Sequence, residues 1–194
     1  TMLWGTKDRL RSVLAAELAA LAGWRSLYAG GRVGLLAFSD RDSVFQPPRE
    51  RDTAMVRIAG SLAQAHRQAL EGLAAGDRVP GAGLENHIDR VARLVPRGST
   101  VVLATGLDDG DEVVEQAIQP LLRLARVEIF LIRDAFERDP PRRNLPYFSE
   151  DGALRWGAFT KGAALAERRV QALREAGATV RVVDADTALE ETVG

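Results

Sequence analysis

Four short apolar runs, each separated from the next by a stretch with helical periodicity, constrain the fold of this chain more than any other feature. The runs are VGLLAF at residues 33–38, TVVLA at 100–104, VEIFLIRD at 127–134 and TVRVVDA at 179–185. Short runs with apolar residues on both faces are typical of strands buried within a sheet. Strands that alternate with helices favour right-handed crossovers between parallel strands. We therefore predict an α/β fold, a Rossmann-like three-layer α/β/α sandwich with a mostly parallel sheet.

Helical stretches fill the gaps between these runs. In the first, apolar residues between Gly5 and Gly23 recur every three or four positions, with Thr6 as the expected N-cap. Pro120 should bend or break the helix that begins near Asp111, because proline removes a backbone donor. The remaining helices are predicted at residues 52–74, 84–94, 160–176, with Gly177 as its stop, and 186–193. The side chains expected to face inward from the helix at 52–74 are Val56, Ile58, Leu62, Ala65, Ala69, Leu70 and Leu73.

Two segments depart from this alternation. Val44 and Phe45 lie in a short run stopped by Pro47 and Pro48, which predicts an antiparallel strand at the edge of the sheet. Residues 135–159 have no helical period, and FSEDGALRW within them has the strand, Asp-Gly turn, strand order of a hairpin. We therefore expect a hairpin inserted into the scaffold at 135–159.

Composition excludes several classes of function. A chain of 194 residues with 46% hydrophobic content can bury one core but is short for two, so residues 1–194 are expected to form a single domain. The net charge of -1 gives no reason to expect nucleic acid as a partner. No cysteine is present, which excludes disulfides and thiolate chemistry, and the two histidines, His66 and His87, are expected at surface or partly buried helix positions.

No known catalytic or targeting pattern occurs in the sequence. There is no Ser-His-Asp order, phosphate-binding loop or His-Glu metal motif. No run is long enough to cross a bilayer and the first residues do not resemble a signal peptide, so we expect no membrane contact by this chain. The expected location is the cytoplasm, with tethering to a membrane as the alternative if the full-length protein is longer.

Charged and aromatic residues beside the predicted strands leave alternatives open. Asp108, Asp109 and Asp111 could form a displaced metal site, but a solvated loop that suits the N-terminus of a helix is favoured. Asp134, with Glu137 after it, either contributes to a polar surface for a partner or anchors its own turn. Trp156, in the predicted hairpin, either marks an interface or packs against the edge of the sheet.

Several ordered phrases resemble a known family. RVGLLAF, PPR, RGSTVVLATGLDD and the series Asp134, Glu137, Leu145, Pro146, Gly152 resemble the domain of unknown function 58 proteins, which are von Willebrand factor A-like. The resemblance implies a von Willebrand factor A-like fold with a metal-ion-dependent adhesion site at the carboxyl ends of its strands. It also implies a MoxR-type AAA+ ATPase as the protein partner.

The same resemblance implies that the metal site is degenerate. Thr1 falls at the last hydroxyl of the family's Asp-x-Ser-x-Ser pattern, so the first strand and its aspartate are expected to be missing. Ala82 and Gly83 stand where the family has Thr or Ser, and Thr105-Gly106 stands where it has Ser-Asp. Two hydroxyl groups without a carboxylate cannot compensate the desolvation of Mg²⁺. We therefore expect no cofactor, with Mg²⁺ as an exception only if residues upstream of Thr1 complete the site.

The function expected from these observations is a non-catalytic protein-interaction domain, an adaptor or partner of a MoxR-type AAA+ ATPase. The alternative is a metal-dependent enzyme, or an intact metal site completed by residues upstream of Thr1 or by another protomer. No residue is expected to be catalytic or to bind metal. The expected partner-binding edge comprises Thr1, Gly5, Ala82, Gly83, Thr105, Gly106, Asp108, Asp109, Asp134 and Glu137.

Overall fold

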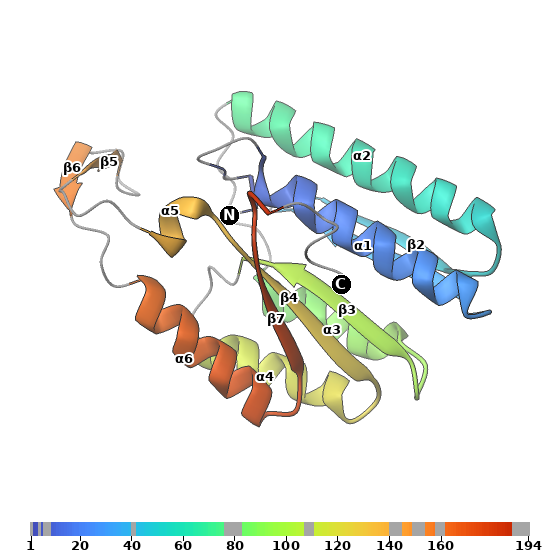
Figure 1. Cartoon of the computed structure of the whole chain (residues 1–194). Helices are drawn as coiled ribbons and strands as arrows, with labels where there is room; N and C mark the ends of the chain where they lie inside the picture. The colour runs from blue at the N-terminus through green and yellow to red at the C-terminus, as the bar shows by residue number, and fades with distance from the viewer. Residues whose placement is uncertain are drawn as a thin grey trace.

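The fold is a mixed α/β arrangement in which helices cover both faces of a parallel sheet (Figure 1). The computed structural model describes residues 2–3, 5, 9–39, 42–75, 83–106, 111–139, 145–148, 154–157 and 162–187. Its elements are α1 (Arg11–Tyr28), β1 (Val33–Phe38), β2 (Ser43–Arg49), α2 (Asp52–Ala74), α3 (Leu84–Leu94), β3 (Thr100–Thr105), α4 (Asp111–Leu122), β4 (Arg126–Arg133), α5 (Ala135–Arg138), β5 (Leu145–Phe148), β6 (Leu154–Gly157), α6 (Gly162–Glu175) and β7 (Thr179–Asp184).

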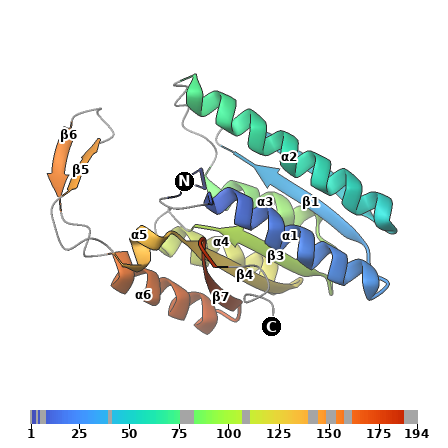
Figure 2. The same cartoon turned by 45° about the horizontal axis from the view of Figure 1, so that its top comes forward.

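The strands form three separate sheets. Parallel strands pair in the order β3-β4-β7, while β1-β2 and β5-β6 are antiparallel pairs. The predicted parallel sheet and antiparallel edge strand are therefore present, but the prediction of one sheet that joins them was wrong for the described residues. Among these residues no strand pairs with the side of β3 that faces away from β4. Figure 2 shows α1 in front of the space between β1 and β3.

Burial differs sharply between β4 and its neighbour β3. Val127, Ile129, Leu131 and Ile132 of β4 are almost completely buried, because β4 has a strand on each side and helices on both faces. Every apolar residue of β3 is only partly buried. Since full burial of one aliphatic side chain stabilises a fold by about 1.5–3 kcal/mol, β4 contributes more to stability than β3 does.

Two clusters of buried residues hold the helices to the parallel sheet. On one face, Leu14 and Leu18 of α1 pack against Ile132, Val183 and Ala185. On the other face, α3, α4 and α6 pack around the strands, and this larger cluster comprises Leu84, Ile88, Val114, Ala117, Ile118, Leu121, Val127, Ile129, Leu131, Val170, Leu173, Ala178 and Val180. In Figure 1, α2 lies on the outer side of α1 and of the β1-β2 pair.

The start of α1 corrects a prediction. The helix begins at Arg11 and its N-cap residue is Leu10, not Thr6, which lies outside the described residues. No side chain caps this end, because the backbone N–H of Ser12 donates to the carbonyl of Met2 instead. A backbone carbonyl of the amino-terminal segment thus accepts from a helix N–H that a capping side chain would otherwise satisfy. The helix also continues through Gly23, where a side-chain carbon would approach the sulfur of Met55 to 2.6 Å, so this glycine allows α1 and α2 to pack closely.

The prolines of β2 lie within the strand, although they were predicted to end it. The β1-β2 register shifts between Val33 and Leu35, so that Pro47 and Pro48 meet an irregular part of the ladder. A strand at a sheet edge tolerates proline at such a position, because no backbone donor is required there.

The predicted inward face of α2 is correct only in part. Ile58 is buried as predicted, but Val56, Leu70 and Leu73 are exposed, and the buried residues Ala54 and Met55 were not predicted to face inward. Since α2 packs through one side only, residues that belong to a broader apolar pattern remain in solvent.

The remaining elements agree closely with the predictions. Helix α3 and strand β1 have the predicted bounds, and Gly177, with φ 107°, ends the turn after α6. Helix α4 runs through Pro120 and ends two residues later, so the predicted break is absent, and the short helix α5 was not predicted. Asp186 and Thr187 lie in a turn, while residues 188–193 of the predicted last helix lie outside the described residues. No helix in the described part is long and apolar enough to span a bilayer.

Candidate functional site

The three parallel strands end at one side of the sheet, which we call the carboxyl edge. It comprises the ends of β3, β4 and β7, helix α5, and the residues that directly follow these strands. Thr105 and Gly106 lie at the end of β3, and Asp134 and Glu137 lie beyond β4. The predicted residues Thr1, Ala82, Asp108 and Asp109 lie outside the described residues.

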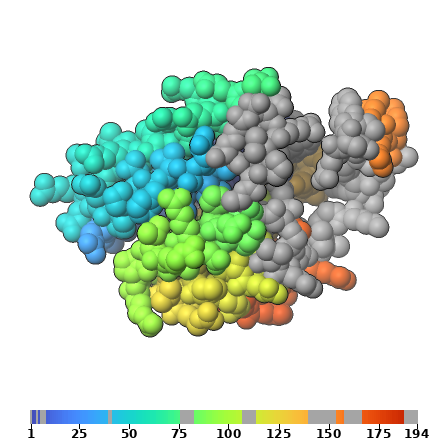
Figure 3. All heavy atoms as spheres, turned by 180° about the vertical axis from the view of Figure 1, so that it is seen from behind, coloured from blue at the N-terminus to red at the C-terminus, as the bar shows by residue number. Residues whose placement is uncertain are grey.

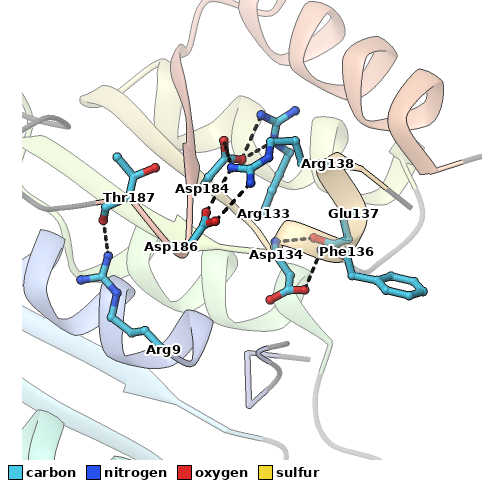
Figure 4. A network of polar contacts seen from close by, with 9 residues as sticks. All are labelled: Arg9, Arg133, Asp134, Phe136, Glu137, Arg138, Asp184, Asp186 and Thr187. Carbon is cyan, nitrogen blue, oxygen red and sulfur yellow. Dashed lines mark hydrogen bonds and ion pairs between the residues drawn. The ribbon is translucent and has the colours of Figure 1, made fainter. Parts of the chain in front are cut away.

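Asp134 anchors the turn between β4 and α5. Its side chain is 1% exposed, and Oδ1 accepts a hydrogen bond of 2.9 Å from the backbone N–H of Phe136 (Figure 4). Glu137 Oε2 accepts a bond of 2.9 Å from the backbone N–H of Asp134, which completes a capping box. These two reciprocal bonds satisfy donors that the first turn of a helix leaves free. Of the two interpretations of Asp134, the structure supports the turn anchor.

Glu137 also joins α5 to α1. Its Oε1 lies 3.3 Å from Nη2 of Arg11, whose side chain is only 4% exposed. A guanidinium group buried to this extent requires a countercharge, because its transfer from water is otherwise costly. The carboxylate of Glu137 is therefore shared between a helix cap and a buried cation.

A second set of ion pairs fixes the end of β7 to β4 and α5. Asp184 accepts from Arg133 at 3.0–3.1 Å and from Arg138 at 3.1 Å, and both carboxylate oxygens of Asp186 lie 3.1 Å from Arg138 (Figure 4). The pKa of Arg138 is raised above its usual value, first by its hydrogen bond to Asp186 and then by that to Asp184. These residues were not predicted as part of a site. Arg138 begins the basic run RDPPRR, but its partners lie far away in the sequence.

Arg9 ties the amino-terminal segment to the same edge. Its Nε donates to the carbonyl of Ala185 at 2.9 Å and its Nη2 donates to the carbonyl of Thr187, while Nη1 pairs with Glu17. In Figure 4, Arg9 approaches β7 from the side of α1, opposite to Arg138. Arginine side chains thus hold both sides of the β7 terminus.

The described carboxylates of this edge do not form a metal centre. Asp134 accepts from a backbone N–H, and Glu137, Asp184 and Asp186 face guanidinium groups. No group of three His, Cys, Asp or Glu residues that could hold a metal ion occurs among the residues that the structure describes. Mg²⁺ requires several convergent oxygen ligands, which this arrangement does not offer.

Other residues named in the sequence analysis make contacts within the fold. A side-chain carbon on Gly5 would lie 2.6 Å from the carbonyl oxygen of Arg9, so the chain passes too closely there for a larger residue. Gly83 is the N-cap residue of α3. The ring of His87 stacks on Phe38 at a centroid distance of 3.9 Å, and His66 Nδ1 lies 3.3 Å from Ser12 Oγ.

The β5-β6 hairpin carries an exposed apolar pair. Trp156 is 66% exposed and Leu154 is 57% exposed. Residues two apart in a strand share a face, so these side chains lie together. Their cross-strand partners in the register are Pro146 and Phe148. Figures 1 and 2 show the hairpin standing away from the parallel sheet, so the alternative in which Trp156 packs against the sheet was wrong.

These observations define the class as an α/β protein whose described carboxyl edge is held by ion pairs and helix caps. The chain belongs to the family described as "Protein of unknown function DUF58", whose family model matches residues 1–142. The predicted resemblance to this family is therefore confirmed. The match ends before the β5-β6 hairpin. No curated protein matches the sequence.

Proposed function

We propose that this protein is a non-catalytic protein-interaction domain that acts as an adaptor or partner of a MoxR-type AAA+ ATPase. In this proposal the fold is von Willebrand factor A-like and the metal-ion-dependent adhesion site is degenerate. The ATPase as partner rests on the family resemblance, whereas the surface used for binding rests on the structure. The observation that carries the proposal is the exposed pair of Trp156 and Leu154 on the β5-β6 hairpin.

The charged residues of the carboxyl edge support a scaffold role for that edge. Asp134, Glu137, Asp184 and Asp186 are engaged with backbone donors or arginines of this chain. Groups held in this way are poorly placed to act as general acids or bases toward a substrate. They instead fix α5, the helix from which the chain continues toward the hairpin.

An exposed tryptophan is well suited to protein recognition. Burial of its large side chain in a partner supplies much of the binding energy of typical interfaces. Leu154, beside it, extends the apolar surface, and solvent-exposed apolar surface of this kind marks interaction sites.

The test is the binding of the full chain to a purified MoxR-type ATPase, measured by biolayer interferometry. We expect Trp156→Ala to raise Kd by about tenfold or more, in the range of interface hot spots. Tyr28→Ala is the matched control, because Tyr28 is an even more exposed aromatic residue at the far end of α1. An equal loss in both variants, or no binding by the unaltered protein, would contradict the proposal.

A metal titration separates this function from the metal-dependent alternative. An ion that binds only the folded state must raise Tm, so a degenerate site predicts no rise with millimolar Mg²⁺ or Mn²⁺. A rise that EDTA reverses would favour a metal-dependent enzyme or an intact adhesion site.

A further inference from the structure

A surface pocket of about 450 Å³, open to solvent and lined mostly by exposed residues, lies at the opposite end of the molecule from the carboxyl edge. Its lining residues are Arg32, Pro48, Arg49, Glu50, Arg51, Thr53, Ala54 and Arg57. They come from the residue before β1, the end of β2 and the start of α2. In Figure 3 this end of the molecule, in cyan and teal, projects at the left. We call this site the arginine cavity.

The guanidinium groups of the arginine cavity have no partner among the described residues. Arg32, Arg49, Arg51 and Arg57 form no side-chain hydrogen bond and no ion pair in the part of the chain that the structure describes. Glu50 is the single acid among the described lining residues, and Asp52 follows in the first turn of α2. Four cations therefore gather around a pocket whose described lining holds one carboxylate, an arrangement in which like charges repel.

The start of α2 adds to this positive potential. The amino-terminal end of a helix carries a partial positive charge, so cations near it are unfavourable and anions are favourable. The N-cap residue of this 23-residue helix is Arg51, and no side chain caps the helix there. Arg51 has φ 73°, and it is the one non-glycine residue with positive φ among those described. The site therefore combines backbone strain with an excess of positive charge that Glu50 and Asp52 offset only in part.

The lining also limits the chemistry of a ligand. Pro48 and Ala54 are the apolar members of the described lining, which contains no aromatic residue, so recognition of a ligand there rests on the arginines. Guanidinium groups form bidentate hydrogen bonds with phosphate oxygens, and several guanidinium groups together favour a multiply charged anion. The volume falls within the range of small-ligand sites.

We propose that the arginine cavity binds a small anion that carries several phosphate groups. The bound anion would neutralise the four guanidinium groups and accept hydrogen bonds from the backbone at the start of α2. The proposal does not depend on the function proposed above, because the hairpin and the carboxyl edge lie at the other end of the molecule.

The experiment is isothermal titration calorimetry of the full chain with inorganic tripolyphosphate. The test variant is Arg49→Gln with Arg57→Gln, which removes two cavity charges. The control variant is Arg168→Gln with Arg181→Gln, which removes two exposed charges from α6 and β7. We expect the test variant to raise Kd by about tenfold or more and the control variant to change it by less than about twofold. Circular dichroism confirms that both variants are folded.

Each contrary result overturns the proposal in its own way. No binding by the unaltered chain would show that the cavity is not an anion site. Equal weakening in both variants would show that net charge, and not the cavity, attracts the anion. Tighter binding of an acidic peptide such as octaglutamate than of tripolyphosphate would show that the surface docks an acidic protein segment.

Discussion

The carboxyl edge and the arginine cavity are both rich in arginine, yet they use it in opposite ways. At the edge, the guanidinium groups of Arg9, Arg133 and Arg138 each lie against a carboxylate of this chain. At the cavity, none of the four lining arginines has such a partner among the described residues. Charges at the edge therefore stabilise the fold, whereas charges at the cavity remain available to a ligand.

The difference arises from where the acids lie in the fold. Asp184 ends β7 and Asp186 follows two residues later, and both lie beside the helix that carries Arg138. At the cavity, the end of β2 is followed by one acid, Glu50, which is the single carboxylate among the described lining residues. If the comparison holds, loss of a charged side chain at the edge should lower stability, whereas loss of a charge at the cavity should leave stability unchanged or raise it where the new residue suits the backbone.

The largest effect is expected from Asp134→Ala at the edge. This substitution removes the acceptor for the N–H of Phe136 and one half of the capping box, so the free energy of unfolding should fall by about 2 kcal/mol. Urea unfolding followed by circular dichroism measures the change. Asp139→Ala, an exposed acid at the other end of α5, is the control. A loss smaller than that of the control would show that the cap is not structural.

A smaller effect, of opposite sign, is expected from Arg51→Gly at the cavity. Glycine adopts φ 73° without strain. Because the relief of strain outweighs the added conformational freedom of the unfolded chain, the free energy of unfolding should rise by about 1 kcal/mol. Arg57→Gly, one turn into the helix, removes the same charge but should destabilise by about 1 kcal/mol, because glycine disfavours a helix interior. Destabilisation by both variants would show that Arg51 is not strained.

Local patterns account for the parts of the fold and site that were predictable. Helix α3 and strand β1 have the predicted bounds, and a glycine-rich turn precedes each of them. Asp134 followed three residues later by Glu137 is the local pattern of a capping box, and both residues were predicted at this edge with two roles left open.

Long-range contacts account for what the sequence did not predict. Arg138 meets Asp184 and Asp186 only after α6 and β7 have folded back beside β4, and no local pattern marks that pairing. Arg32 precedes β1 in the sequence and Arg57 comes after β2, yet both line the cavity. The exposure of Val56 follows from the single packed face of α2, which depends on tertiary contacts.

Arg133→Gln provides a modest test of the edge. Arg133 and Asp184 form an ion pair of 3.0 Å in which both side chains are partly exposed, so solvent screening limits its value to about 0.5 kcal/mol. A double-mutant cycle with Asp184→Asn isolates the coupling between the two residues. The coupling should shrink at high salt, because ions screen partly exposed charges. A coupling energy that does not change with salt would show that packing, and not charge, couples the two residues.

The smallest effect on stability is expected from the variant with both Arg49→Gln and Arg57→Gln. These side chains are exposed and have no partner among the described residues, so the free energy of unfolding should change by less than about 0.5 kcal/mol. Tripolyphosphate should then raise Tm of the unaltered protein but not of this variant, because a ligand stabilises only the state that binds it. Differential scanning calorimetry measures both quantities. A large loss of stability without ligand would mean that these arginines, like those of the carboxyl edge, hold the fold together.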